Sequence, residues 1–120
     1  MRNRISVALC TRDGEAHLGE QLASIAAQSR PPAELVVCDD ASDDGSMVIL
    51  ESFAGEAPFP VRIERNRRPV GVTANFSRAF ELCSGDMICP CDQDDQWRED
   101  KLERVSQAFG VGVGDRKSVV

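Results

Sequence analysis

Short apolar runs alternate with segments of helical period along this chain, and that order constrains its fold more than any other feature. The four runs are ISVALCT (5–11), ELVVCD (34–39), VRIE (61–64) and DMICPC (86–91). Apolar residues recur at helical spacing over residues 17–28, 47–53, 76–83 and 102–109. Strands that alternate with helices predict an α/β fold, in which a parallel sheet of about four strands carries helices on both faces.

Turn and helix-breaking residues set the boundaries of these elements. The stretch ASDDGS (41–46) supplies turn and capping residues, and Gly85 is expected to end the third helix. Pro90 restricts the last strand to a sheet edge or to its final residues. Residues 1–109 are therefore predicted to form one domain, and residues 110–120, which have no periodicity, an irregular tail.

The charge balance and composition exclude several classes of protein. The chain has 14 lysines and arginines against 20 acidic residues, a net charge of −6, and only 5% aromatic residues. A nucleic-acid binder needs a basic surface and usually stacking rings, so we expect no nucleic-acid partner. No apolar run approaches the ~20 residues that span a bilayer, and the N-terminus lacks the pattern of a signal peptide. The five cysteines lie mostly in apolar segments, which predicts buried free thiols in a reducing cytoplasm.

Polar residues follow three of the predicted strands, at the point where each strand ends. They are Thr11, Arg12 and Asp13 after the first run, Asp39 and Asp40 after the second, and Asp92, Gln93, Asp94 and Asp95 after the fourth. In open α/β sheets, ligands bind in the crevice outside the carboxyl ends of the strands. We therefore expect these groups to meet at one edge of the sheet and to form the functional site.

Two of these groups are acidic, and converging carboxylates repel each other unless a cation or a hydrogen-bond donor compensates them. Asp92 and Asp94 have the alternate spacing that places two side chains on one side of an extended segment. Such carboxylates suit Mg²⁺ or Mn²⁺, which also bind water and substrate phosphates. The alternative is a solvated acid cluster at a helix N-terminus; the second acidic pair favours the metal site. For Asp40 two interpretations stay open, a contact with the N–H of a pyrimidine base or a turn and helix cap.

Three stretches occur in a characteristic order: SVALCTRDGEAHLGEQLASIAAQS, ELVVCDDASDDGS and NRRPVGVTANFSRAFELCSGDMICPCDQDDQWREDKL. Together they resemble family 2 glycosyltransferases with the GT-A fold. The third stretch contains the aspartate-x-aspartate-aspartate-x-tryptophan run that is typical of the rhamnosyltransferase-like branch. The resemblance covers about residues 4–106 and implies the Rossmann-like, nucleotide-sugar-binding half of a GT-A domain.

The resemblance implies which residues bind the nucleotide sugar. Asp40 matches the aspartate that contacts the base, and Thr11 and Arg12 lie where the first-strand loop lines the nucleotide pocket. Gly71 and Asn75 match the glycine and asparagine of the segment that packs over the nucleotide and the sugar.

The resemblance also implies a metal site and a reaction. Asp92 and Asp94 match the aspartate-x-aspartate motif and are the predicted ligands of Mn²⁺ or Mg²⁺, Asp94 the more direct ligand and Asp92 nearer the ribose. The implied reaction transfers a sugar from a nucleotide-diphosphate sugar, linked to UDP or dTDP, to an acceptor hydroxyl with inversion at the anomeric carbon. The metal stabilises charge on the departing diphosphate, and a separate carboxylate, for which we find no candidate, takes the acceptor proton.

The chain departs from the family pattern in three respects. The family usually continues for about another hundred residues that hold the acceptor pocket, so this chain is expected to carry the donor-binding part. Cys10 stands where the family usually has proline, and Arg12 where an aromatic ring often stacks on the base, although arginine can stack as well. The alternative function is a catalytically incomplete nucleotide-binding fragment that acts by binding only. Further expectations are a cytoplasmic location, a membrane-associated acceptor glycan or lipid, and a homo-oligomer.

Overall fold

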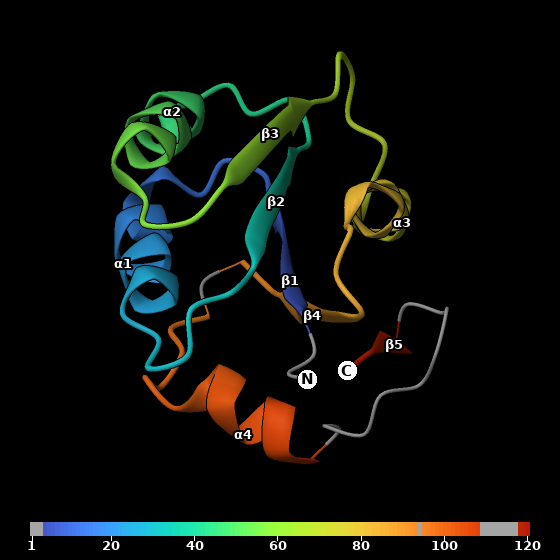
Figure 1. The fold of residues 1–120 in the computed structure, drawn as a ribbon. Coiled ribbons are helices and arrows are strands. Elements are labelled where there is room, and N and C mark those ends of the chain that lie inside the picture. Colours follow the sequence, from blue (N-terminus) through green and yellow to red (C-terminus); the bar gives the residue numbers. More distant parts are fainter. Residues whose placement is uncertain (1–3, 94, 109–117) are drawn as a thin grey trace.

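The fold is built on a parallel sheet whose strands lie in the order β3-β2-β1-β4-β5 (Figure 1). The structure, a computed structural model, describes residues 4–93, 95–108 and 118–120. The strands are β1 (Ile5–Thr11), β2 (Glu34–Asp39), β3 (Val61–Arg65), β4 (Met87–Cys91) and β5 (Ser118–Val119). The four strands predicted from the sequence are confirmed, and so is their parallel pairing.

The short strand β5 lies in the segment for which the sequence predicts an irregular tail. Ser118–Val119 pairs with the first two residues of β4, so the end of the chain extends the sheet. Residues 110–117 of that tail and Phe109 lie outside the described residues, and the domain boundary at 109 stays a prediction. Pro90 lies beyond the part of β4 that pairs with β5, at a position where a missing amide hydrogen is tolerated.

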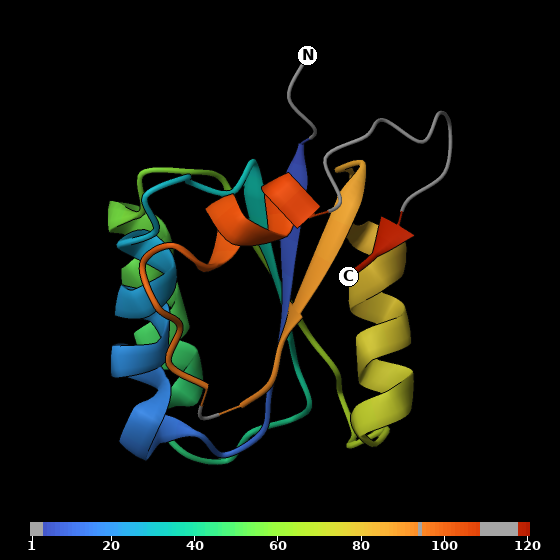
Figure 2. The ribbon, with the colours of Figure 1, turned by 90° about the horizontal axis from the view of Figure 1, so that it is seen from below.

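Helices cover both faces of the sheet, as the sequence predicts (Figure 1 and Figure 2). The helices are α1 (Glu15–Ala26), α2 (Ser46–Glu56), α3 (Val72–Leu82) and α4 (Lys101–Ala108). One face carries α1 and α2, and the other carries α3. Through the buried Leu102, α4 joins the core on the side of α1 and α2.

Alternation along β1 explains how one strand serves two cores. Val7 and Leu9 belong to the cluster that contains Leu22 of α1, whereas Ala8 belongs to the cluster that contains Ala79 of α3. Burial of a leucine or valine side chain stabilises the fold by about 1.5–3 kcal/mol. The strands are therefore buried on both faces, which accounts for their nearly continuous apolar runs.

Gly85 permits a close approach between the turn before β4 and the start of β1. A Cβ at this position would lie 2.6 Å from Ser6 Oγ and 2.7 Å from the carbonyl oxygen of Arg4. The Gly85 amide donates to Ser6 Oγ at 2.8 Å, and that hydroxyl donates to Glu34 Oε2 at 2.6 Å. The expectation that Gly85 ends the third helix is wrong, because α3 ends at Leu82; packing against β1 is what requires the glycine.

All five cysteines are buried and free, as the sequence predicts. Burial raises the pKa of Cys10 and of Cys91 to about 12, so both are protonated thiols at neutral pH. In the part of the chain that the structure describes, none of the helices is long and apolar enough to cross a membrane.

Candidate functional site

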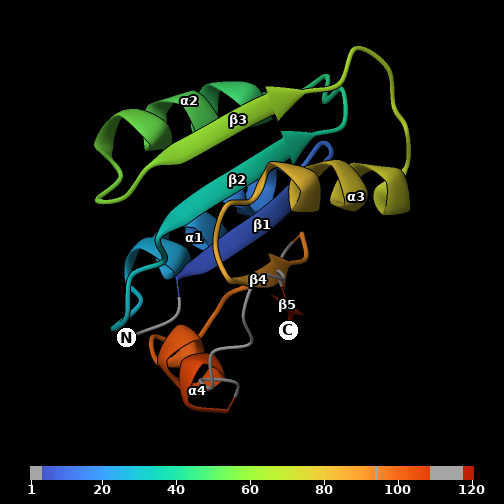
Figure 3. The same ribbon diagram turned by 45° about the vertical axis from the view of Figure 1, so that its right-hand side comes forward.

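The loops that follow β1, β2 and β4 meet at the carboxyl edge of the sheet, as the sequence predicts. The Asp40 amide donates to the carbonyl oxygen of Thr11 at 2.8 Å, and Thr11 Oγ1 donates to Asp39 Oδ1 at 2.6 Å. The Arg12 amide donates to the side-chain oxygen of Gln93 at 2.7 Å, which joins the loops after β1 and β4. In Figure 3 the arrowheads of β2 and β3 point toward this edge, where the loop before α3 also lies.

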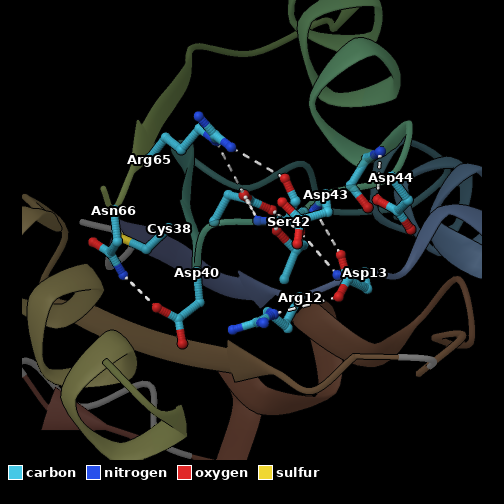
Figure 4. Close-up of polar contacts among 12 residues, drawn as sticks. Arg12, Asp13, Cys38, Asp40, Ser42, Asp43, Asp44, Arg65 and Asn66 are labelled. Carbon is cyan, nitrogen blue, oxygen red and sulfur yellow. Dashed lines mark hydrogen bonds and ion pairs between the residues drawn. The ribbon is translucent and has the colours of Figure 1, made fainter. Parts of the chain in front are cut away.

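Main-chain and side-chain hydrogen bonds interlock the loops after β1 and β2 (Figure 4). The Asp13 amide donates to Ser42 Oγ at 2.8 Å, and the Asp43 amide donates to Asp13 Oδ1 at 2.8 Å. Asp44 Oδ1 accepts a hydrogen bond from the first amide of α2 at 2.9 Å. The predicted turn role of the ASDDGS stretch is confirmed, and these acidic residues serve the loop structure. The N-cap of α2 is Gly45, so the predicted side-chain capping hydrogen bond is absent at that residue.

Asp40 is 6% exposed, and both of its carboxylate oxygens accept hydrogen bonds. Oδ1 accepts from Asn66 Nδ2 at 2.9 Å and from the Val70 amide at 2.8 Å, and Oδ2 accepts from the Gly71 amide at 3.0 Å. Burial by itself raises the pKa of Asp40, but these hydrogen bonds and the charge of Arg12 outweigh it and hold the pKa below its ordinary value. Asp40 thus anchors the loop before α3; a contact with a base stays a prediction.

Gly71 precedes α3 with a φ of 92°, in the region that strains residues other than glycine. A buried amide network connects this loop to β2. Asn66 Nδ2 donates to Asn75 Oδ1 at 2.9 Å, and Asn75 Nδ2 donates to the carbonyl oxygen of Cys38 at 2.8 Å. Arg78 donates to Asn66 Oδ1 and orients it further. The amide of Asn75, 2% exposed, is therefore held within the protein, and its contact with a nucleotide stays a prediction.

A cavity of about 210 Å³ opens at this edge of the sheet. Its lining residues are Cys10, Thr11, Arg12, Asp40, Val72, Asn75, Phe76, Asp92 and Gln93. All of the predicted site residues are among them except Gly71 and Asp94, and Asp94 lies outside the described residues. Pockets that enclose a whole drug-sized ligand measure roughly 300–1,000 Å³, so this cavity has the size for one ring of a larger ligand.

Sequence reasoning missed part of the cavity wall. Phe76 counted only as one of the apolar positions of α3, because helical period does not distinguish a core position from a cavity wall. The sequence places Gln93 at a strand end without indicating a role, whereas in the structure its side-chain oxygen accepts a hydrogen bond from the Arg12 amide. Phe76 and the neutral thiol of Cys10 add apolar surface to a cavity that Asp40 and Asp92 also line.

Among residues 4–93, 95–108 and 118–120, no three histidine, cysteine or acidic side chains are grouped so that they could hold a metal ion. Asp92 is exposed and lines the cavity, whereas the oxygens of Asp40 already accept three hydrogen bonds. Mg²⁺ and Mn²⁺ need only one or two protein carboxylates when phosphates and water complete the shell. The hard oxygen donor of Asp92 fits such a cation.

The model of one protein family, glycosyl transferase family 2, matches residues 6–112. The match covers most of the chain, so the chain belongs to this family. The resemblance that the three sequence stretches indicate is thereby confirmed.

Two curated proteins illustrate the relationship. The dTDP-rhamnosyl transferase RfbG of Shigella flexneri is 33% identical over 99 residues, which are 79% of this chain and 34% of that protein. An uncharacterized glycosyltransferase of Nostoc sp. is 27% identical over 108 residues, 88% of this chain and 33% of that protein. The chain spans about a third of the length of the curated relatives that it matches.

Solved structures share the fold. S. aureus TarS 1–349 in complex with UDP-GlcNAc has a TM-score of 0.81 at 24% identity, over 89% of this chain and 31% of that one. The mannosyltransferase PcManGT from Pyrobaculum calidifontis, in complex with GDP-Man and Mn²⁺, has a TM-score of 0.82 at 23% identity. This match covers 96% of this chain and 33% of that one. The predicted α/β fold of GT-A type is confirmed.

Proposed function

We propose that the chain is the donor-binding part of a glycosyltransferase that transfers a sugar from a nucleotide-diphosphate sugar to an acceptor hydroxyl with inversion. The observation that supports this most is the cavity at the carboxyl edge of the sheet, which gathers residues from the end of β1, from the loops that follow β1, β2 and β4, and from α3. Ligands of open α/β sheets bind at this edge. Membership of glycosyl transferase family 2 supplies the class of reaction.

In this proposal the cavity takes the base of a UDP- or dTDP-linked sugar. A carboxylate offers about four acceptor sites; three donors occupy Asp40, which leaves one for the N–H of a pyrimidine. The guanidinium of Arg12, on a side chain 43% exposed, pairs with Asp13 through Nε at 3.4 Å, and in this proposal its planar face stacks on the ring. Thr11 and Asn75 line the pocket, and Gly71 shapes the loop beside it.

Asp92 and Asp94 are the proposed ligands of Mn²⁺ or Mg²⁺, Asp94 the more direct one and Asp92 nearer the ribose. A cation bound there supplies Lewis-acid stabilisation of charge on a departing diphosphate. The position of Asp92 on the cavity supports this role, and so does the Mn²⁺ in the complex of PcManGT. We assign none of the described residues to the base that takes the acceptor proton.

The second candidate function is a nucleotide-binding fragment that catalyses no transfer. Release of UDP or dTDP from a nucleotide sugar in the presence of an acceptor distinguishes the two candidates, because the fragment would bind the donor without consuming it.

Location and assembly are further parts of the proposal. Five free buried cysteines support a reducing cytoplasm. A homo-oligomer stays part of the proposal, and light scattering of the purified chain tests it. A membrane-associated glycan or lipid is the proposed acceptor.

Isothermal titration with UDP, dTDP and GDP, with and without Mn²⁺, tests donor binding. We expect Mn²⁺-dependent binding of UDP or dTDP and a loss of at least about tenfold, ~1.4 kcal/mol, in Asp92→Asn. The matched control is Asp43→Asn, which removes the same charge from an exposed residue outside the cavity and is expected to bind like the wild type. A folded wild-type chain that binds no nucleotide would contradict the proposal.

A further inference from the structure

We propose that Gln21, a buried glutamine of α1, is a positioning residue that fixes the main chain of Asp92 at the donor site; this inference rests on the proposed function. Gln21 is 1% exposed. Its Nε2 group donates to the carbonyl oxygen of Asp92 and to Cys91 Sγ, the latter at 3.3 Å. Cys91 ends β4 and Asp92 begins the loop, so Gln21 holds the chain at the point where the strand enters the site.

The acceptors determine the orientation of the Gln21 amide. A carbonyl oxygen only accepts, so the NH₂ group must face Asp92; the reverse orientation would set two oxygens against each other. The Oε1 atom is then buried without a hydrogen-bond partner among the described residues. A buried unpaired acceptor destabilises a fold, and an apolar side chain would avoid that cost. Buried polar groups that lack a partner, and so break the usual rules of protein packing, concentrate at functional sites.

Two other polar residues, Ser24 of α1 and Gln28 just after the end of that helix, bind later parts of the same segment. Ser24 Oγ accepts the amide hydrogen of Trp97 at 3.1 Å. Gln28 Oε1 accepts the amide hydrogen of Leu102 at 2.9 Å, and Gln28 Nε2 donates to the carbonyl oxygen of Arg98 at 2.7 Å. None of these contacts reaches a residue that lines the cavity. Gln28 therefore stabilises the segment away from the donor site and serves as a matched control.

The hydrogen bond from Gln21 to the main chain of Asp92 gives the Asp92 carboxylate a defined position. Asp92 lines the cavity, and its side chain can be placed only as well as the main chain that carries it. Binding groups need to be held within about 0.5 Å of the productive geometry. Loss of an outer residue that orients a metal ligand typically lowers metal affinity about 10–100-fold.

Gln21→Met and Gln28→Met test this role, because each replaces a buried amide by an apolar side chain of similar length. Isothermal titration of UDP into the 120-residue chain, repeated over a series of Mn²⁺ concentrations, gives the Mn²⁺ dependence, and thermal unfolding gives Tm. The Gln21→Met variant is expected to need at least about tenfold more Mn²⁺ than the wild type to bind UDP, with a small change in Tm. Gln28→Met, which loses more hydrogen bonds, is expected to lower Tm further and to keep the wild-type Mn²⁺ dependence.

Two results would overturn the inference while leaving the proposed function intact. One is a Gln21→Met variant with the wild-type Mn²⁺ dependence. The other is a higher Mn²⁺ requirement for UDP binding in both variants, in proportion to the fall in Tm of each. That result would make Gln21 a structural residue only. A wild-type chain that binds no UDP with Mn²⁺ contradicts the proposed function itself, and the inference then fails with it.

Discussion

Replacing Asp40 with asparagine is expected to loosen the loop before α3, because the carboxylate accepts three hydrogen bonds that a carboxamide cannot accept together. Asparagine has one acceptor oxygen and two N–H groups. In either orientation its NH₂ group faces at least one of the donors of Asn66, Val70 and Gly71. The variant therefore loses one hydrogen bond outright, and the remaining ones lose their charged acceptor.

The size of the effect follows from these contacts. A hydrogen bond to a charged group contributes about 1.5–3 kcal/mol. We expect Asp40→Asn to lower the free energy of unfolding at pH 7 by about 2–3 kcal/mol. For a domain of this size, such a loss corresponds to a fall in Tm of roughly 6–15 °C.

The effect should depend on pH, because the pKa of Asp40 in the folded chain lies below its ordinary value. The unfolded state then binds the proton more readily, so the carboxylate stabilises the fold above the unfolded pKa of about 3.9. This contribution is lost as the pH falls through the folded pKa. The difference between the wild type and Asp40→Asn should therefore shrink as the pH is lowered below about 4.

Urea unfolding followed by the fluorescence of Trp97, the one tryptophan of the chain, measures the effect at pH 7 and at pH 3.5. Asp43→Asn, which removes a charge from an exposed side chain, is the control and is expected to change stability by less than about 0.5 kcal/mol. A loss in Asp40→Asn as small as in this control, or one equal at both pH values, would refute the anchoring role.

Two further predictions concern packing and burial. Gly85→Ala should lower the free energy of unfolding by about 2–3 kcal/mol, since its Cβ would lie 2.6–2.7 Å from neighbouring oxygens. Gly19→Ala, with nothing within 4 Å of the new Cβ in α1, should raise it by about 0.5–1 kcal/mol; equal changes in Tm would contradict the packing argument. The five buried thiols should react slowly with Ellman's reagent in the native chain and fully in urea, since burial raises the pKa of Cys10 and Cys91 to about 12. Rapid native labelling would contradict their burial.

Much of the fold could be predicted because its signals are local. Apolar runs and helical period give the order of strands and helices, and that order implies a parallel sheet. The parallel sheet in turn implies that Thr11, Asp40 and Asp92 approach one edge, and the structure places all three on one cavity. The composition of the stretch ASDDGS alone predicts its turn, because short polar side chains form hydrogen bonds with the nearby main chain.

The residues that the sequence misjudged act through partners far along the chain. Gly85 looked like a helix end, yet its neighbours are Ser6 and Arg4. Gln21 showed no signal, because a polar residue on a helix is usually solvated, and its partner Asp92 is 71 positions away. Phe76 had the period of a core residue and lines the cavity.

The sequence by itself determined the alternation of elements, the parallel sheet and the edge where polar residues gather, because these depend on side-chain period and strand order. Only the tertiary structure decided which donors face each carboxylate. Asp40 meets the amides of residues 70 and 71 instead of capping the helix that follows it. Hydrogen bonds are short and directional, so partners are fixed only once distant segments pack together.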